Sequence, residues 1–230
     1  RITYDYGANY LKDDDEGVVE LVRDSLDGEG LVEVAGPVDV FDESGTVSSG
    51  RDSNDSKRSY RAGISTLAER LLDGTGARVK HGVRARRVRR SDDRWRVVDD
   101  DGDGWGPFDA LLLTPPAPQT ERLLRAGDPG ARRRALADAA AAVPYRSVYT
   151  GVLGYGFRLD RPYYGLVNVD KDHEVGWISR EEHKPGHVPA GQTVLVVQAR
   201  PDWSVAPADA DPAGTPAARA APAPGAAGDA

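Results

Sequence analysis

The sequence of 230 residues contains no cysteine. Disulfide bonds, thiolate metal sites and cysteine nucleophiles are therefore excluded. No apolar run approaches the ~20 residues that a membrane-spanning helix needs, and no signal-peptide pattern opens the chain. These absences predict a soluble, cytoplasmic protein that does not contact a membrane. Lysine is also scarce, and it occurs only at positions 12, 57, 80, 171 and 184.

A basic surface is also missing. The formal net charge is -7, whereas nucleic-acid-binding proteins normally present a basic patch. Arginines cluster at 87–90 and at 132–134, but acidic runs balance them, so we interpret both clusters as solvated faces. An acidic, lysine-poor surface suits a high-salt cytoplasm, and a biased base composition of the gene explains it equally well. We expect a small-molecule substrate as the partner, and no nucleic acid.

Hydrophobic periodicity and turn residues predict an α/β or α+β fold. Thr66 and Glu69 have the spacing of a capping box, and Gly74 stands where a left-handed residue ends a helix. The expected elements of the first part of the chain are a strand at 2–6, a helix through 18–26, strands at 31–34 and 38–41, a polar loop at 48–58 and a helix at 64–72.

The second part begins with a predicted β-meander over 79–98, closed by a glycine-rich hairpin at 99–104. Residues 108–113 are continuously apolar, which predicts a strand covered on both faces. Thr114 and Pro115 end this run, because proline cannot donate to a ladder. Helices near 118–126 and 130–142 and strands between 148 and 197 are expected to follow. The Ala/Pro-rich segment 205–230 is predicted to be disordered.

No motif in the sequence identifies a catalyst. His183 and His187 are four residues apart, but Pro185 and Gly186 lie between them, so no helix aligns the two rings and we predict no metal site. Residues 99–104 begin like a calcium-binding loop, but its twelfth position is Ala110, so a hairpin turn is favoured. The G-x-G-x-x-G fingerprint is absent.

Four segments, in order, resemble the renalase-like branch of the FAD-dependent, flavin-containing amine oxidase family. They are YDYGANY at 4–10, YRAGISTL at 60–67, FDALLLTPPAPQ at 108–119, and 176–204 with GWISR, KPG and PDWS. The resemblance implies a partial FAD/NAD(P)-binding, Rossmann-like domain at 60–127. It also implies an antiparallel-sheet substrate domain of the amine-oxidase type, formed by 1–59 and 144–204.

The same resemblance implies where the cofactor lies. Val83 would contact the adenine side of FAD through its backbone, and Thr114 and Pro115 would end a strand beside the cofactor. Trp177 and Lys184 resemble residues on the flavin side; a buried tryptophan and a surface lysine are the alternatives. FAD would carry the redox chemistry, so no acid–base triad is needed.

Two elements of the family are missing from the sequence. About fifty residues that hold the pyrophosphate at a helix N-terminus would have to precede Arg1, which implies an N-terminal truncation. The closing Gly-Asp segment is replaced by the Ala/Pro tail, which a shifted reading frame would explain.

Three hypotheses for function follow. The first is an oxidoreductase that oxidises an amine or a dihydronicotinamide-type, NAD(P)H-like molecule, with O₂ or another acceptor reoxidising the flavin. The second is a non-catalytic remnant or interaction module that has lost FAD, working as a homo-oligomer or with a completing polypeptide. The third is an unrelated small α/β binding protein.

Overall fold

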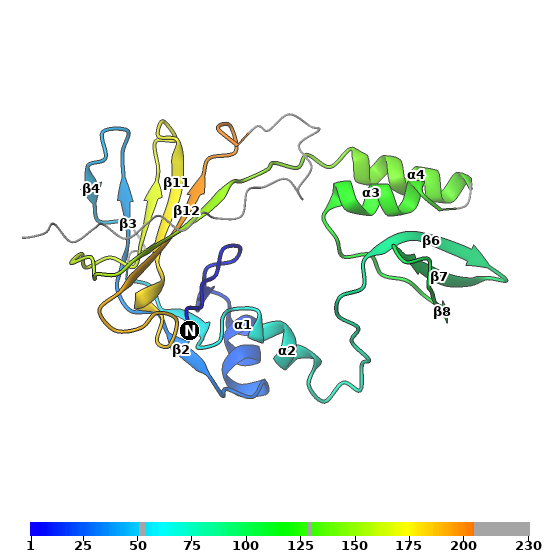
Figure 1. Ribbon diagram of the computed structural model, residues 1–230, viewed down its shortest axis with the longest axis horizontal. Helices are drawn as coiled ribbons and strands as arrows, with labels where there is room; N and C mark the ends of the chain where they lie inside the picture. Colours follow the sequence, from blue (N-terminus) through cyan, green and yellow to red (C-terminus); the bar gives the residue numbers. More distant parts are fainter. Residues whose placement is uncertain (51–53, 128–129, 205–230) are drawn as a thin grey trace, which may run out of the picture.

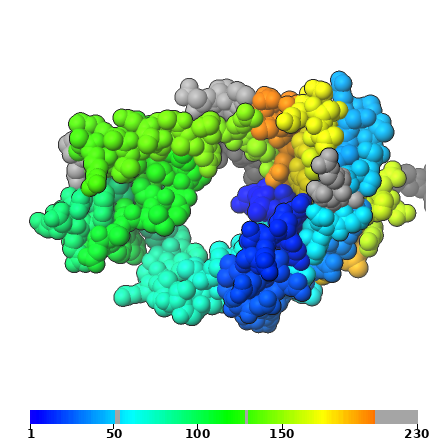
Figure 2. Space-filling model, turned by 180° about the vertical axis from the view of Figure 1, so that it is seen from behind, coloured from blue at the N-terminus to red at the C-terminus, as the bar shows by residue number. Residues whose placement is uncertain are grey.

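The computed structural model describes residues 1–50, 54–127 and 130–204, which form two bodies joined by extended segments (Figure 1). The larger body holds the chain up to α2 and again from β9 onward, and the smaller body lies between them in sequence. Figure 2 shows an opening between the two bodies, bordered by the N-terminal residues in dark blue and by segments coloured aqua and green. Among the described residues, no helix is long and apolar enough to cross a bilayer.

A six-stranded sheet forms the centre of the larger body, with the strand order β4-β3-β10-β11-β12-β9. All its pairings are antiparallel except that of β10 with β3, which is parallel. The strands are β3 (Val38–Phe41), β4 (Val47–Ser48), β9 (Thr150–Tyr155), β10 (Gly165–Asn168), β11 (Val175–Arg180) and β12 (Thr193–Ala199).

A second, three-stranded sheet of the larger body has the order β1-β5-β2. Its strands are β1 (Leu11–Lys12), β2 (Leu31–Glu33) and β5 (Lys57–Tyr60). Helix α1 (Glu16–Glu20) begins at Asp15, whose carboxylate accepts from the Val18 N–H, and continues as one π-helical turn over Leu21–Ser25. Helix α2 (Thr66–Leu72) follows β5, and Gly74 after it has a positive φ of 76°.

The smaller body is a β-meander covered by two helices. Strands β6 (Ala85–Ser91), β7 (Arg94–Asp99) and β8 (Gly104–Phe108) pair in this order, and α3 (Ala117–Arg125) packs on β6 and on α4 (Ala131–Ala141). Its core consists of buried Val88, Leu124 and Ala137 with partly buried apolar neighbours. These local elements confirm both helices and the meander, except that residues 79–84, predicted to belong to it, precede β6 and form no strand.

Three expectations are wrong. Residues 2–6 form no strand, because their polar groups bond to scattered partners such as the His187 carbonyl, which accepts from the Thr3 N–H. The predicted polar loop at 48–58 contains the start of β5. Thr66 and Glu69 do not form a capping box, since the residue before α2, Ser65, is helical and makes no side-chain cap bond.

The apolar run at 108–113 also differs from its prediction. β8 ends at Phe108, and the next residues belong to no helix or strand, with no strand paired to them in the described part of the chain. Leu111 and Leu113 pack against the core of the smaller body, whereas Leu112 is 85% exposed. A strand covered on both faces needs neighbours that a local sequence window does not reveal. The predicted disorder of 205–230 concerns residues outside the described ranges.

Candidate functional site

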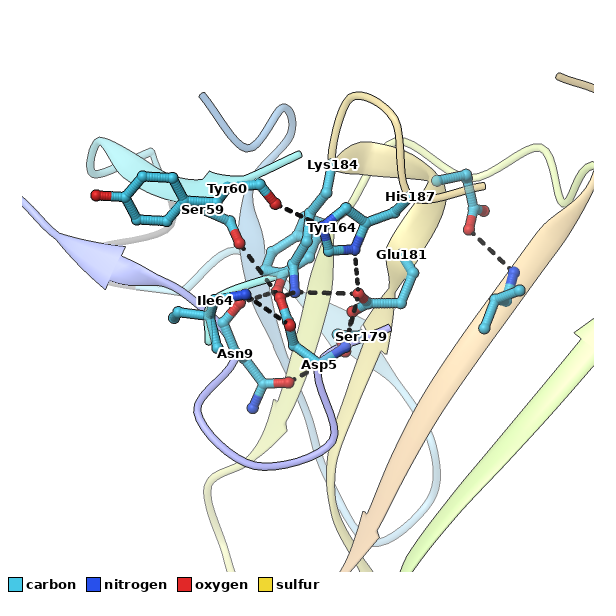
Figure 3. A network of polar contacts seen from close by, with 12 residues as sticks. Asp5, Asn9, Ser59, Tyr60, Ile64, Tyr164, Ser179, Glu181, Lys184 and His187 are labelled. Carbon is cyan, nitrogen blue, oxygen red and sulfur yellow. Dashed lines mark hydrogen bonds and ion pairs between the residues drawn. The ribbon is translucent and has the colours of Figure 1, made fainter. Parts of the chain in front are cut away.

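A buried cluster of charged side chains lies where β11 leaves the central sheet (Figure 3). After β11 the chain makes a 3-10 turn, η2 (Glu181–His183). Backbone hydrogen bonds then run from the Lys184 N–H to the Glu181 carbonyl and from the His187 N–H to the Lys184 carbonyl, at 3.0 and 3.1 Å. The second bond closes a turn in which Gly186 has a positive φ of 92°. Figure 3 shows that the side chains of Glu181, Lys184 and His187 come together in the same space.

The ammonium group of Lys184 joins two carboxylates at the centre of this cluster. Its Nζ lies 2.8 Å from Asp5 Oδ2 and 3.1 Å from Glu181 Oε2. The Lys184 side chain is fully enclosed, and both carboxylates are buried as well. Isolated charges are too costly to bury, so each carboxylate depends on its neighbouring donors.

His187 supplies the second donor to Glu181. Its Nδ1 lies 2.9 Å from Glu181 Oε2, and its Nε2 lies 2.9 Å from the carbonyl oxygen of Tyr60. Through these two contacts the His187 ring joins the turn after β11 to the end of β5.

Asp5 connects the N-terminal segment to the same cluster. Its Oδ1 accepts from the backbone N–H of Ile64 at 2.9 Å, and its Oδ2 accepts from the Ser59 hydroxyl at 3.2 Å. Its own N–H donates to Glu181 Oε2. Three separate stretches of the chain, at Asp5, 59–64 and 181–187, therefore meet in one buried network.

Aromatic rings cover one side of the cluster. Tyr164 lies beneath the Lys184 ammonium, which is 5.7 Å from the ring centroid, and its hydroxyl donates to the Asn9 carbonyl at 3.3 Å. Burial, followed by the negative charge of Glu181, holds the pKa of Tyr164 well above its usual value of 10.0. The phenol therefore stays protonated and acts as a donor.

Trp177 completes the aromatic group. Its ring lies 6.2 Å from both Tyr10 and Tyr164, centroid to centroid. The ring passes over Gly165, where a Cβ would lie 2.7 Å from Trp177 Cη2, so the site requires glycine there. The indole N–H of Trp177 is buried and, among the described residues, has no hydrogen-bond partner.

The residues predicted to contact FAD fall into two groups. Trp177 and Lys184 lie on the larger body and share Tyr164 as a neighbour. Val83 lies on the exposed segment that leads from the larger body to β6, and Thr114 and Pro115 lie on the exposed segment between β8 and α3 within the smaller body. The alternative of a surface lysine at 184 is wrong, because that side chain is fully buried. The assignment of all five residues to a cofactor site stays a prediction.

Sequence reasoning missed Asp5, Glu181 and the role of His187. Asp5, Glu181 and His187 also have ligand atoms within 4.8 Å of one another, which is close enough to hold a metal ion. However, the Lys184 ammonium already bridges the two carboxylates, so this space contains an intrinsic cation. The spacing of three between positions 181, 184 and 187 was the available signal, but nothing local placed Asp5 beside them.

Residues 10–208 match the model of the flavin containing amine oxidoreductase family. The chain belongs to this family. Its membership confirms the flavin-oxidoreductase relationship that the four segments indicated and the α/β fold class.

Two solved structures are similar to the chain. One is a protein assigned as a protoporphyrinogen oxidase from Exiguobacterium sp. 255-15, with 21% identity over 64% of this chain and a TM-score of 0.46. The other is a reduced UDP-galactopyranose mutase, with 15% identity over 65% of this chain and a TM-score of 0.49. The matches cover 32% and 33% of those chains, so this chain spans about a third of their length. Because both scores are below 0.5, the family assignment rests on the family model.

Proposed function

We propose that this chain is the substrate-side body of a renalase-like, FAD-dependent oxidoreductase that oxidises an amine or a dihydronicotinamide-type small molecule. The family match over residues 10–208 carries the proposal. FAD would accept the electrons of the substrate, which explains why the protein needs no triad of its own. The two predicted domains, 60–127 and 1–59 with 144–204, are part of the same proposal.

The residues present fit a flavin in part. The unpartnered indole N–H of Trp177 is a donor of the kind that a flavin carbonyl accepts, and the backbones of Val83 and Thr114 lie in exposed segments outside any strand. Lys184 does not fit direct contact, since its ammonium is enclosed by Asp5 and Glu181. Its role would be to hold the N-terminal segment beside Tyr164. This would position the aromatic rings of Tyr10, Tyr164 and Trp177.

Flavin binding tests this proposal directly. After incubation with FAD and removal of free cofactor, we expect the protein to retain the visible absorbance of bound flavin. Replacing Trp177 with phenylalanine keeps the ring and removes the donor, so the Kd for FAD should rise by about three- to tenfold. Trp203→Phe, at an exposed tryptophan, is the matched control and should leave the Kd unchanged. If the protein retained no flavin, the proposal that this chain alone is a FAD-dependent oxidoreductase would be rejected.

One observation favours the second candidate, an interaction module completed by another polypeptide or by a second copy. Leu112 is 85% exposed in an extended segment, and no backbone hydrogen bond joins 109–115 to a strand in the described part of the chain. Unpaired extended backbone with apolar side chains is a template for strand addition. We expect concentration-dependent association in light scattering, and Leu112→Asp should abolish it. A monomer at all concentrations would exclude self-association through this segment.

A further inference from the structure

A polar pocket lies next to the charged cluster, at the end of β5. It has a volume of ≈ 380 Å³. Its wall is formed by three arginines, three hydroxyl-bearing residues, one glutamate and small residues: Arg1, Thr3, Glu29, Gly30, Tyr60, Arg61, Ala62, Thr66, Arg70 and Gly186. None of these residues belongs to the predicted FAD contacts, and positive side chains outnumber negative ones.

The side chain of Tyr60 points toward this pocket and away from the charged cluster. Figure 3 shows its carbonyl facing His187 while its ring and hydroxyl extend in the opposite direction. Tyr60 is fully buried, yet its hydroxyl has no hydrogen-bond partner among the described residues, and the same holds for the buried Nε of Arg70. Buried polar groups are normally satisfied. Two unsatisfied donors in one wall therefore indicate a ligand that accepts hydrogen bonds.

Arg61, which is exposed, and Arg70 differ in how they are held. Arg70 forms ion pairs with Asp27 at 3.3 Å and with Asp73 at 3.5 Å, so its charge is compensated. Arg61 has no side-chain hydrogen bond or ion pair within the described ranges, although its stem packs on Gly186, where a Cβ would lie 2.3 Å from Arg61 Cγ. This contact holds an uncompensated guanidinium at the pocket.

We propose that the Tyr60–Arg61–Arg70 pocket binds a small oxyanion, namely the carboxylate or phosphate group of a metabolite. Arg61 supplies the charge and a planar pair of donors, which suit both oxyanions. The Tyr60 hydroxyl and Arg70 Nε supply the remaining donors and orient the bound group. Glu29, an exposed residue whose carboxylate lies 3.8 Å from Arg70 Nη2, places a negative charge beside the pocket and disfavours ligands that are negative over their whole surface. The site goes beyond the proposed flavin chemistry and does not require it.

Titration of the full chain with inorganic phosphate and, separately, with acetate tests the proposal. Sodium chloride at equal ionic strength serves as the blank. We expect saturable binding of at least one of the two anions by calorimetry, and the anion that saturates identifies the group. Arg61→Gln should raise that Kd about tenfold or more, and Tyr60→Phe by about three- to tenfold. Arg84→Gln, at an arginine 82% exposed outside the pocket, should bind like the unaltered protein.

Two results would overturn the proposal: no saturable binding of either anion, or equal binding by the Arg61→Gln variant and the unaltered protein. Tyr60→Phe removes only an unsatisfied hydroxyl, so this variant should fold even if Arg61→Gln does not. Repeating the titration with excess FAD separates the two proposals. Unchanged anion affinity places the anion in its own site, whereas competition by FAD would assign the pocket to the cofactor and reject a separate site. Failure of FAD to bind leaves the anion result intact.

Discussion

Lys184→Met is expected to lower the free energy of unfolding by about 3–5 kcal/mol, because removing one partner of a buried ion pair leaves an uncompensated charge. Here the remaining charges would be the carboxylates of Asp5 and Glu181, which both contact the ammonium. The midpoint of urea unfolding, at unchanged slope, measures the loss. Lys171→Met is the control, since that side chain is exposed and surface changes usually stay within about 0.5 kcal/mol.

A second substitution separates lost charge pairing from lost packing. Asp5→Asn, introduced into the Lys184→Met protein, removes one unpaired charge and keeps the oxygen that accepts from Ile64. We expect the double variant to regain part of the lost stability, because the residues are coupled through one contact. If the single variant were as stable as the unaltered protein, the charged cluster would not hold the N-terminal segment in place.

Arg180→Met should cause a loss of similar size, about 3–5 kcal/mol, at the opposite end of the same turn. Arg180 is 1% exposed, and its Nη2 lies 2.8 Å from the buried carboxylate of Glu182. Nη2 also donates to the Leu159 carbonyl, and Nη1 donates to the carbonyls of Arg161 and Tyr163, so the guanidinium holds the loop before β10.

Arg180→Lys tests whether charge alone is sufficient. Lysine keeps the positive charge but lacks the planar fork, so we expect an intermediate stability. Amide hydrogen exchange should also become faster in 159–163 in both variants, because the loop loses its side-chain donors. Arg158→Met, at an exposed arginine of the same loop, is the control. Full stability of the lysine variant would show that the carbonyl contacts contribute little.

Local pattern was sufficient for most of the fold. The helix before β2, the strands at 31–33 and 38–41, the β-meander and the two helices of the smaller body all follow from periodicity and turn residues. The four ordered segments also pointed to the correct family, since the family model matches 10–208. These signals lie within windows of a few residues, and within such a window the residue pattern predicts which element forms.

The parts that could not be predicted depend on distant neighbours. Asp5 and Lys184 are 179 residues apart, and no local feature of YDYGANY shows that its aspartate is buried. The prediction of a covered strand at 108–113 was wrong for the same reason, because burial of Leu112 depends on an element beside it. The six apolar residues predict that neighbouring elements cover both faces of this segment. Among the described residues, no element covers Leu112.

The parallel pairing of β10 with β3 has a consequence for the order in which the chain folds. In sequence, one of these strands precedes the whole smaller body and the other follows it. Asp5 cannot contact Glu181 until that residue, 176 positions later, has been made. During synthesis the meander and its two helices complete their contacts while the central sheet still lacks four strands, β9 to β12. Contacts of such high sequence separation form slowly. The charged cluster is therefore the closing step of assembly, and Asp5 remains solvated until the last quarter of the chain has emerged.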